Sequence, residues 1–469
     1  MEPPGDREAR HGRTLNPKES DARVGVSVVA GPSAGTHATS ARPSPHDSSY
    51  RDRVSHRRPL RASVVAASLA SLLAACTTGG ESSPVVSVLP AVTTTVPTRV
   101  DDGVLRIGTL LPTTGAGAGL GTPLTAAVQA AVDSINESGG LLGQPVELVT
   151  TDETSTVDLS ALVGAGVDAI VGPASSNVAL RVLGEATEAG LVVCSPTATA
   201  IALDDFPDQN LFFRTVGSDS LQMSALARTA ARTGSRTIAI VHLDDRYGRD
   251  MVASLRDAVA ERSVLSIIAE IPVNGDDPDL SEEAIETIDS GAGIVIVLGD
   301  TDDGGRLLGA IDRAIGATGA PTPFIIVNDS LRAASQTAVE MSGTTRERVI
   351  GVAPRSVVPN IDEPSGNFAT NAHDCVNLIA LAALQAGSDN PIRIAGQMAS
   401  ASSGGRVCTA FEDCATLVRS GLQIDYAGLS GPIEISTATG DLARATFNEF
   451  RFDAFGNDVI ANAAGFEIG

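Results

Sequence analysis

The chain has 469 residues, of which 43% are hydrophobic, and a formal net charge of −23 at pH 7. This length corresponds to about two or three compact units, and the acidic excess argues against nucleic acid or an anionic lipid surface as a partner. Lys18 is the only lysine, and only His242 and His373 lie beyond the first sixty residues, which excludes a phosphate-binding Walker A loop and disfavours a histidine-rich metal site.

The N-terminal region is predicted to be a targeting segment. Residues 1–58 show no hydrophobic period, so we expect them to be disordered or a mis-called upstream segment. Residues 59–75 combine arginine, a short apolar run and small residues before Cys76, and they resemble the lipoprotein signal peptide of bacteria. The alternative is an ordinary secretory signal followed by a chance cysteine. Residues 76–103 are rich in Thr, Ser, Gly, Pro and Val, and we expect a flexible tether.

This leader predicts where the protein resides. If Cys76 is acylated and becomes the mature N-terminus, the protein is exported and anchored by lipid at the outer face of the cytoplasmic membrane. No later apolar run in the sequence is long enough to span a bilayer. Membrane contact is therefore expected through the lipid alone.

The first part of the folded chain alternates short apolar strands with amphipathic helices. Strands are predicted at 105–111, 146–150, 169–172 and 191–194, and helices at 124–137, 159–163 and 177–189. Because strand and helix alternate, we expect a mostly parallel sheet with helices on both faces.

The same alternation then restarts. Strands are predicted at 237–241, 266–271, 293–298, 324–327 and 349–352, and helices at 221–232, 251–261, 281–289 and 306–315. A long helix at 367–386, a helix at 411–419 and short strands near Ile433 and at 447–452 follow.

Two α/β halves and a mixed tail predict two lobes with several crossovers. We expect residues 104–216 with 354–428 to form lobe 1, and residues 217–353 with 429–469 to form lobe 2. Ligands bind beyond the carboxyl ends of strands in open α/β sheets, so a cleft between the lobes is the expected binding site.

Polar loops follow two strands of the first half. A glycine-rich loop at 113–121 lacks the third glycine of a dinucleotide fingerprint. Ser175 and Ser176 open a helix where exposed N–H groups suit a carboxylate, although an ordinary helix cap explains them equally well. Thr197 and Thr199 end the next strand, and the neighbouring hydroxyl loop strengthens the ligand interpretation.

In the second half, candidate residues also follow strands. Tyr247 comes after the strand at 237–241 and could cover a ligand, although an isolated tyrosine more often packs in the core. Asp329, next to Asn328, could bind an ammonium group, with a helix N-cap as the alternative. Asp300 also ends a strand and is the second candidate acid, unless it is only a solvated turn.

The cysteines fit an exported protein. Cys408 and Cys414 would close a small loop by a disulfide, whereas a metal knuckle would need a second Cys or His pair nearby. Cys194 and Cys375 could pair with each other or remain buried thiols, and the sequence leaves both open.

These features together resemble a type I periplasmic binding protein of the branched-chain amino-acid ABC transporter class, of the actinobacterial lipoprotein type. The resemblance covers residues 105–453. It rests on motifs in a shared order: residues 133–140, Gly143, Asp152 with Glu153, Gly172, the Ser and Thr loops, 213–215, Tyr247 with Gly248, 425–432, and Gly440 with Asp441.

The resemblance implies a fold and a set of ligand contacts. The fold has two lobes, each a mostly parallel sheet flanked by helices, with the ligand cleft between them. Ser176, Thr197 and Thr199, with Ser175 beside them, match positions that bind an α-carboxylate. Asp329 matches the acid that holds the α-ammonium group, and Tyr247 matches an aromatic residue of the cleft.

Two departures from the family pattern concern the side-chain pocket. One aromatic is replaced by Leu120 or Gly119, and another by Asp300 or Thr301, so leucine, isoleucine or valine cannot be assumed as the ligand. The resemblance implies a non-enzymatic, lipid-anchored substrate-binding subunit of an ABC importer for an amino acid or related small polar solute. Its partner would be a membrane permease, and neither cofactor nor metal is expected.

Two other functions compete with this interpretation. A ligand-sensing receptor module of the same fold would signal instead of delivering its ligand. An exported hydrolase would need a nucleophile beside a base, and His242 and His373 are the only candidate imidazoles. The single Gly-x-Ser-x-Gly match, at 31–35, lies in the leader and not on a strand-to-helix turn.

Overall fold

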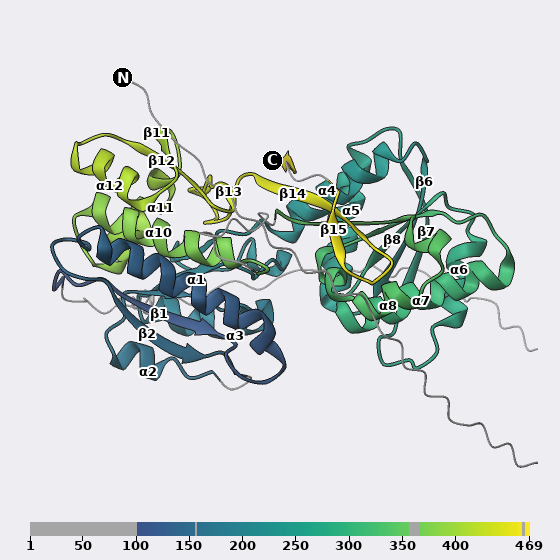
Figure 1. Ribbon diagram of the computed structural model, residues 1–469, viewed down its shortest axis with the longest axis horizontal. Helices are drawn as coiled ribbons and strands as arrows, with labels where there is room; N and C mark the ends of the chain where they lie inside the picture. The colour runs from purple at the N-terminus through teal and green to yellow at the C-terminus, as the bar shows by residue number, and fades with distance from the viewer. Residues whose placement is uncertain (1–100, 155–156, 356–365, 462–464) are drawn as a thin grey trace, which may run out of the picture. The chain divides into compact units, whose positions relative to one another are not determined.

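A five-stranded parallel sheet organises lobe 1 (Figure 1). The computed structural model describes residues 101–154, 157–355, 366–461 and 465–469. The strand order is β2-β1-β3-β4-β5, with β1 (Arg106–Leu111), β2 (Glu147–Asp152), β3 (Ala169–Val171), β4 (Val192–Ser195) and β5 (Phe212–Arg214). Every pairing in this sheet is parallel, as the alternation of strands and helices predicts.

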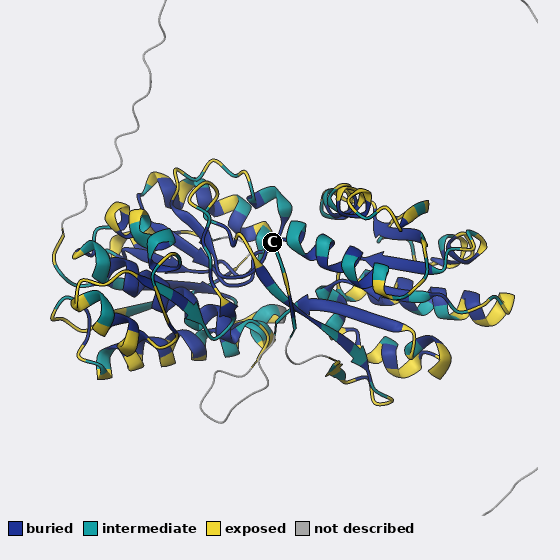
Figure 2. Ribbon diagram, turned by 90° about the horizontal axis from the view of Figure 1, so that it is seen from above, coloured by how far each residue is buried: buried dark blue, intermediate teal, exposed yellow. Residues whose placement is uncertain are grey.

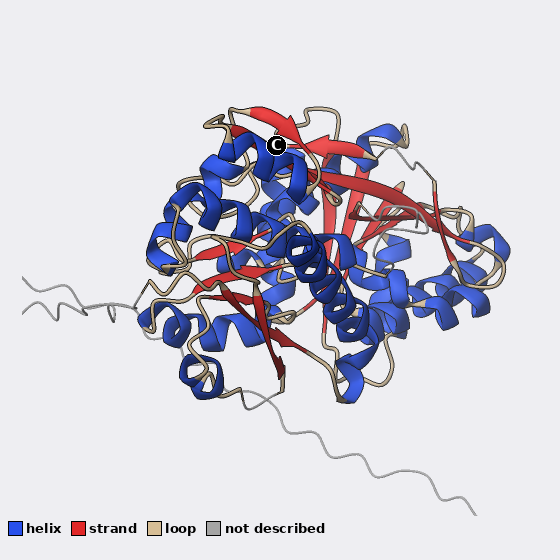
Figure 3. Cartoon of the chain, turned by 60° about the vertical axis from the view of Figure 1, so that its left-hand side comes forward, coloured by secondary structure: helices blue, strands red, loops and turns tan. Residues whose placement is uncertain are grey.

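Helices cover both faces of this sheet (Figure 3). They are α1 (Ala118–Glu137), α2 (Ser160–Gly164), α3 (Ser176–Glu188), α10 (Ala369–Ala386), α11 (Pro391–Ala401) and α12 (Phe411–Arg419), with short 3-10 turns η1 (Gly115–Gly117) and η2 (Ile201–Leu203). Successive strand residues point to opposite faces. Val192 accordingly packs with α1 and α10, whereas Val193 packs with α2 and α3.

Lobe 2 is built on an eight-stranded sheet. Its order is β15-β14-β10-β9-β8-β6-β7, with β16 paired to β14. The parallel strands are β6 (Thr237–Leu243), β7 (Ser266–Val273), β8 (Ile294–Leu298), β9 (Phe324–Val327) and β10 (Val349–Pro354). Strand β14 (Ala445–Phe452) runs antiparallel to β10, β15 (Asp458–Ile460) and β16 (Phe466–Ile468).

The helices of lobe 2 also lie on both faces of its sheet. They are α4 (Asp219–Arg232), α5 (Arg246–Ala260), α6 (Ser281–Asp289), α7 (Thr301–Thr318), η3 (Asp329–Ala333), α8 (Ser335–Glu340) and α9 (Gly343–Arg346). Helices α4 and α5 pack in one hydrophobic core, and α6 and α7 pack in another. The central strands are almost wholly buried (Figure 2), so the confirmed two-lobed α/β fold rests on apolar burial from both sides of each sheet.

A small third sheet corrects the expected lobe boundary. It joins β11 (Arg406–Cys408), β12 (Ile424–Gly428) and β13 (Gly431–Pro432). Because β13 pairs with β12 and the Gly440 carbonyl accepts a hydrogen bond from the Arg214 N–H of β5 at 3.2 Å, residues 429–442 belong with lobe 1. The expected boundary after residue 428 is therefore too early, and the chain returns to lobe 2 with β14.

Helix starts differ most from the sequence-based expectation. Helix α5 begins at Arg246 and not at Met251, because the Asp245 carboxylate accepts a hydrogen bond from the Gly248 N–H at 2.7 Å. Helix α7 begins five residues early for the same reason, capped by Asp300. Helix α1 begins within the glycine-rich loop, where a Cβ on Gly121 would lie 1.7 Å from the Pro112 carbonyl oxygen.

Several short elements were not predicted: β5, β11, β12, β15, β16, α8, α9 and α11. Strand β5, for example, is only three residues long, and helix α11 begins with Pro391. Within the described ranges, no helix is both long and apolar enough to cross a membrane.

Candidate ligand-binding site

A cavity of about 350 Å³ lies where strand ends of both lobes meet. Lobe 1 lines it with the start of α3 and the segment after β4, and lobe 2 with the segment after β6, the start of α5, and Asp300 and Ser330. This is the position that open α/β sheets favour for a ligand. Of the predicted residues, Ser175, Ser176, Thr199, Tyr247 and the second candidate acid, Asp300, line this cavity.

The Ser loop is held in place by a buried acid. Glu153 is 9% exposed, and its two carboxylate oxygens accept hydrogen bonds from the Ala174 N–H at 2.6 Å and the Ser175 N–H at 2.8 Å. The Ser175 hydroxyl caps α3 by accepting from the Val178 N–H at 3.4 Å. The Ser176 hydroxyl accepts from the Ala200 N–H at 3.2 Å, which joins the two polar loops directly.

The two threonines of the next loop have different surroundings. Thr197 is 9% exposed, and its hydroxyl donates to the Ala174 carbonyl at 2.6 Å, so this side chain braces the Ser loop and does not line the cavity. Thr199 does line it. The structure thus separates two residues that the sequence placed in the same role.

Arg214 fixes the backbone around Thr199. Its side chain is fully buried, and it donates to the Ala198 and Ala200 carbonyls at 3.3 Å each. The same guanidinium pairs with Asp204 at 2.6 Å and Asp441 at 2.5 Å. Arg214 therefore positions the Thr loop through both of its neighbours, a role that the sequence did not reveal.

Asp329 lies close to the cleft but in a separate small cavity. It is half-buried, and its Oδ1 accepts from the Gln222 side chain at 2.9 Å. Arg332 and Arg355 line the same small cavity, and burial is the main cause that raises the pKa of Asp329. Asn328, the alternative at this position, is fully buried and exchanges hydrogen bonds with the Gly299 backbone, so it braces the strand ends.

A second acid, Asp219, lies beside these groups and was not predicted. It occupies the first position of α4, is 1% exposed, and neither carboxylate oxygen has a hydrogen-bond partner. Burial raises the pKa of Asp219 to about 7, with a further increase from Asp329. The hydroxyls of Tyr247 and Thr199 lie near the Asp219 carboxylate and partly lower its pKa. Neither hydroxyl has the distance and angle of a hydrogen bond to that carboxylate. In the sequence, Ser218 and Asp219 look like an ordinary helix cap, so the sequence does not single out Asp219.

Tyr247 lies in the first turn of α5, in the cavity wall and beside these two acids. Burial and the charge of Asp219 raise the pKa of its phenol well above the ordinary value. A protonated phenol can donate a hydrogen bond to a carboxylate or to a ligand. Tyr247 can therefore donate either to Asp219 on one side or to a ligand in the cavity on the other.

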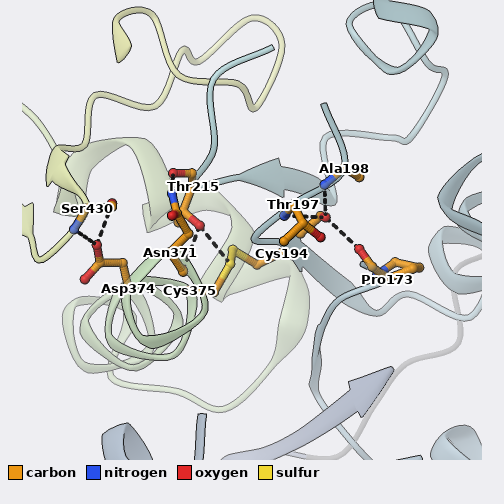
Figure 4. Close-up of a disulfide and its surroundings, with 10 residues drawn as sticks. Pro173, Cys194, Thr197, Ala198, Thr215, Asn371, Asp374, Cys375 and Ser430 are labelled. Carbon is orange, nitrogen blue, oxygen red and sulfur yellow. Dashed lines mark hydrogen bonds between the residues drawn. A yellow bond between two sulfur atoms is a disulfide. The ribbon is translucent and has the colours of Figure 1, made fainter. Parts of the chain in front are cut away.

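A disulfide stands directly behind the Thr loop (Figure 4). Cys194, near the end of β4, is joined to Cys375 of α10 across 181 positions of sequence. Thr215 packs against the bridge and exchanges hydrogen bonds with Asn371. The sequence left open whether Cys194 and Cys375 form a disulfide or remain buried thiols, and the structure shows the disulfide.

The other cysteines lie away from the cavity. Cys408 and Cys414 form a disulfide in lobe 1, with Cα atoms 5.4 Å apart. Cys76 and the rest of the leader lie outside the described residues. Among the residues that the structure describes, no group of three or more His, Cys, Asp or Glu is arranged to hold a metal ion.

A larger cavity, of about 420 Å³, lies on lobe 2 among α7, α8 and the segment before α6. It contains none of the predicted binding residues, and no strand of lobe 1 reaches it. The polar loops of both lobes converge instead on the cavity of about 350 Å³, which makes that cavity the candidate ligand site.

Two α/β lobes with a polar cavity between their strand ends define a type I periplasmic binding protein, a class of non-catalytic receptors. The chain belongs to the periplasmic binding protein family, whose model matches residues 104–389. The match therefore includes the five-stranded sheet of lobe 1 and the parallel strands β6–β10 of lobe 2.

Individual relatives agree with this assignment. The chain is 27% identical, over 71% of its length and 84% of the relative, to the chemotactic signal transduction system substrate-binding protein BasB of Halobacterium salinarum. It is 25% identical, over 75% of its length and 92% of the relative, to the Leu/Ile/Val-binding protein BraC3 of Rhizobium johnstonii. The isoleucine complex of LivJ from Streptococcus pneumoniae shares the fold, with a TM-score of 0.55 and 20% identity over 76% of this chain and 99% of LivJ.

Proposed function

We propose that this protein is the extracellular, lipid-anchored substrate-binding subunit of an ABC importer, and that its ligand is an amino acid or a related small polar solute. The observation that carries the proposal is the cavity in which Ser176 and Thr199 of one lobe face Tyr247 of the other. The named relative BraC3, a Leu/Ile/Val-binding protein, supports an amino acid as the ligand.

The lobe 1 side of the cavity suits a carboxylate. The first turn of α3 has free N–H groups beside the hydroxyl of Ser176, and a helix N-terminus favours negative charge. Thr199 adds a hydroxyl that lies within the same cavity. A ligand carboxylate placed here would gain several hydrogen bonds from one rigid lobe.

The lobe 2 side suits a positive charge. Tyr247 stands in front of Asp219, and Asp329 lies beside it. Charge-assisted hydrogen bonds between a carboxylate and an ammonium group are stronger than neutral ones. A zwitterionic head group would therefore bridge the two lobes and favour their closure around it.

A thermal-shift screen of the purified protein tests this function. We expect at least one compound from a panel of amino acids, amides and urea to raise the melting temperature. A ligand at a hundred times its Kd stabilises the folded state by about 2.7 kcal/mol, which such a screen detects readily. A complete panel of amino acids without any shift would contradict the proposal.

The lipid anchor has its own test. Cys76→Ala should move the protein from the membrane fraction into the medium or leave it unprocessed, because acylation requires that thiol. Thr78→Ala, two residues further along the same segment, is the matched control and should stay membrane-bound. Release of the unmodified protein to the same extent as Cys76→Ala would rule out the anchor.

A second candidate function is sensing. It is favoured by one specific observation, the similarity to BasB, which belongs to a chemotactic signal transduction system. Both functions use the same cleft. Deletion of a neighbouring permease separates them, because uptake would stop while a ligand-dependent behavioural response would remain.

A further inference from the structure

Asp219 is a buried acid without a hydrogen-bond partner. Its side chain is 1% exposed, and neither carboxylate oxygen accepts a hydrogen bond. Most buried polar groups in proteins are paired, and an unpaired carboxylate charge is expensive to bury. The neutral, protonated form is therefore favoured, and burial raises the pKa of Asp219 to about 7.

The charged and titratable groups that act on Asp219 come from three other elements. After burial, the charge of Asp329 in η3 raises the pKa of Asp219 further. Arg214 of β5 opposes this increase, but its guanidinium already forms ion pairs with two other acids. Tyr247 of α5 is the third group, and its phenol is close enough to lower the pKa of Asp219.

Asp219 lies behind the wall of the cavity and not in it. Its backbone N–H donates to the Thr199 carbonyl at 2.8 Å, which links the start of α4 to the Thr loop of lobe 1. Its carboxyl group lies near the phenol of Tyr247, and Tyr247 lines the cavity. An effect of Asp219 on a ligand would therefore pass through one of these two neighbours.

The phenol of Tyr247 has a single proton to donate, so the charge of Asp219 determines where that proton points. Burial raises the pKa of this phenol well above its ordinary value, which keeps it protonated. An ionised carboxylate accepts a stronger hydrogen bond than a neutral group does, and an ionised Asp219 would turn the phenol proton away from the cavity. A neutral Asp219 leaves the proton free for a ligand oxygen, such as a carboxylate held by Ser176 and Thr199.

We propose that Asp219 is a positioning residue for Tyr247: in its protonated form it leaves the phenol free to donate to the ligand, and loss of its proton weakens ligand binding. This inference rests on the proposed function and adds proton-linked control to the same cavity. The receptor would hold its ligand more tightly in a slightly acidic medium than in an alkaline one.

A pH titration of tyrosine fluorescence tests this role in the free protein. The chain has three tyrosines and no tryptophan, so its intrinsic emission comes from tyrosine, and a hydrogen bond from a phenol to a carboxylate quenches that emission. We expect the emission to fall as the pH rises from 6 to 8, and Asp219→Asn and Tyr247→Phe should each abolish the fall. Emission that is independent of pH in the natural protein, or an equal fall in Asp219→Asn, would overturn the inference.

Titration calorimetry with L-leucine measures the effect on binding. With a pKa of about 7, Asp219 is about nine-tenths protonated at pH 6 and about one-tenth protonated at pH 8. The affinity of the natural protein should therefore fall by up to about tenfold between these pH values. Asparagine has the shape of aspartate but cannot ionise, so Asp219→Asn should bind L-leucine equally well at both, close to the natural protein at pH 6. An affinity that rises with pH would overturn the inference.

The matched control is Asp257→Asn, because Asp257 is an exposed acid on α5, the helix that carries Tyr247. This variant should keep the full pH dependence of the natural protein. Histidines also titrate between pH 6 and pH 8, and an effect that came from a histidine would persist in Asp219→Asn. Persistence of the full pH dependence in Asp219→Asn would therefore contradict the role of Asp219.

The two measurements separate this inference from the proposed function. If neither L-leucine nor any other amino acid binds, the proposed function fails, and the fluorescence titration still decides whether Asp219 controls the phenol of Tyr247. If L-leucine binds with the same affinity at pH 6 and pH 8, the amino-acid receptor stands and the positioning role is wrong.

Discussion

Replacing Arg214 by methionine should lower the free energy of unfolding by about 3–5 kcal/mol, because it leaves two acids without their buried partner. The guanidinium is fully buried and pairs with Asp204 and Asp441, at 2.6 and 2.5 Å. Burial, with a smaller contribution from the charge of Asp204, raises the pKa of Asp441, and Arg214 opposes that increase. Urea unfolding followed by circular dichroism measures the loss.

The effect should reach the ligand site as well. Arg214 also donates to the carbonyls on either side of Thr199, so its loss frees the segment that carries one of the proposed ligand contacts. We expect ligand affinity to fall even under conditions where the variant remains folded. Calorimetry at low temperature, with a ligand found in the thermal-shift screen, would show this.

An exposed arginine provides the matched control. Arg232 pairs with Glu449 at 3.2 Å but its side chain is 59% exposed, so Arg232→Met should cost less than about 1 kcal/mol. A triple variant, Arg214→Met with Asp204→Asn and Asp441→Asn, removes the stranded charges and should recover part of the stability. Equal losses for Arg214→Met and Arg232→Met would contradict the role given to the buried cluster.

Removing the disulfide between Cys194 and Cys375 should lower the free energy of unfolding by about 3–5 kcal/mol. The bridge closes a loop of 181 positions, and a long closed loop restricts the unfolded chain more than a short one. It also ties the strand that leads into the Thr loop to α10, which comes from a distant part of the chain. We expect the double alanine variant to unfold at a lower urea concentration.

The second disulfide is an internal control for this prediction. Cys408 and Cys414 are six positions apart and both are buried, so the double alanine variant creates similar voids but frees a much shorter loop. Loss of the Cys408–Cys414 bridge should lower the free energy of unfolding by about 2 kcal/mol. A larger effect from the short loop would show that packing, and not chain entropy, determines the contribution of these bridges.

The sequence by itself determined the fold class and most of the elements. Strands such as β8 (Ile294–Leu298) and β9 (Phe324–Val327) are continuous apolar runs, which identify strands buried on both faces. Their alternation with amphipathic helices leaves few topologies other than parallel sheets. The order of short motifs then pointed to the family that the comparisons confirmed.

The sequence also indicated that Ser175, Ser176, Thr199 and Tyr247 would lie near one another, and all four line one cavity, because the carboxyl ends of parallel strands meet at one edge. It did not distinguish Thr197 from Thr199, which are two residues apart in the same loop. Their roles differ because the hydroxyl of Thr197 reaches the Ala174 carbonyl of the neighbouring loop. Such a contact depends on how two loops meet in space.

Only the tertiary structure decided which charges are buried. Asp219 looks like any acid in the first turn of a helix, and Arg214 like any arginine at the end of a short strand. Their environment is made by segments hundreds of positions apart, as the Arg214–Asp441 pair shows. The pairing of Cys194 with Cys375 was decided in the same way. Local periodicity specifies strands and helices, but the desolvation of a charge depends on every element packed around it.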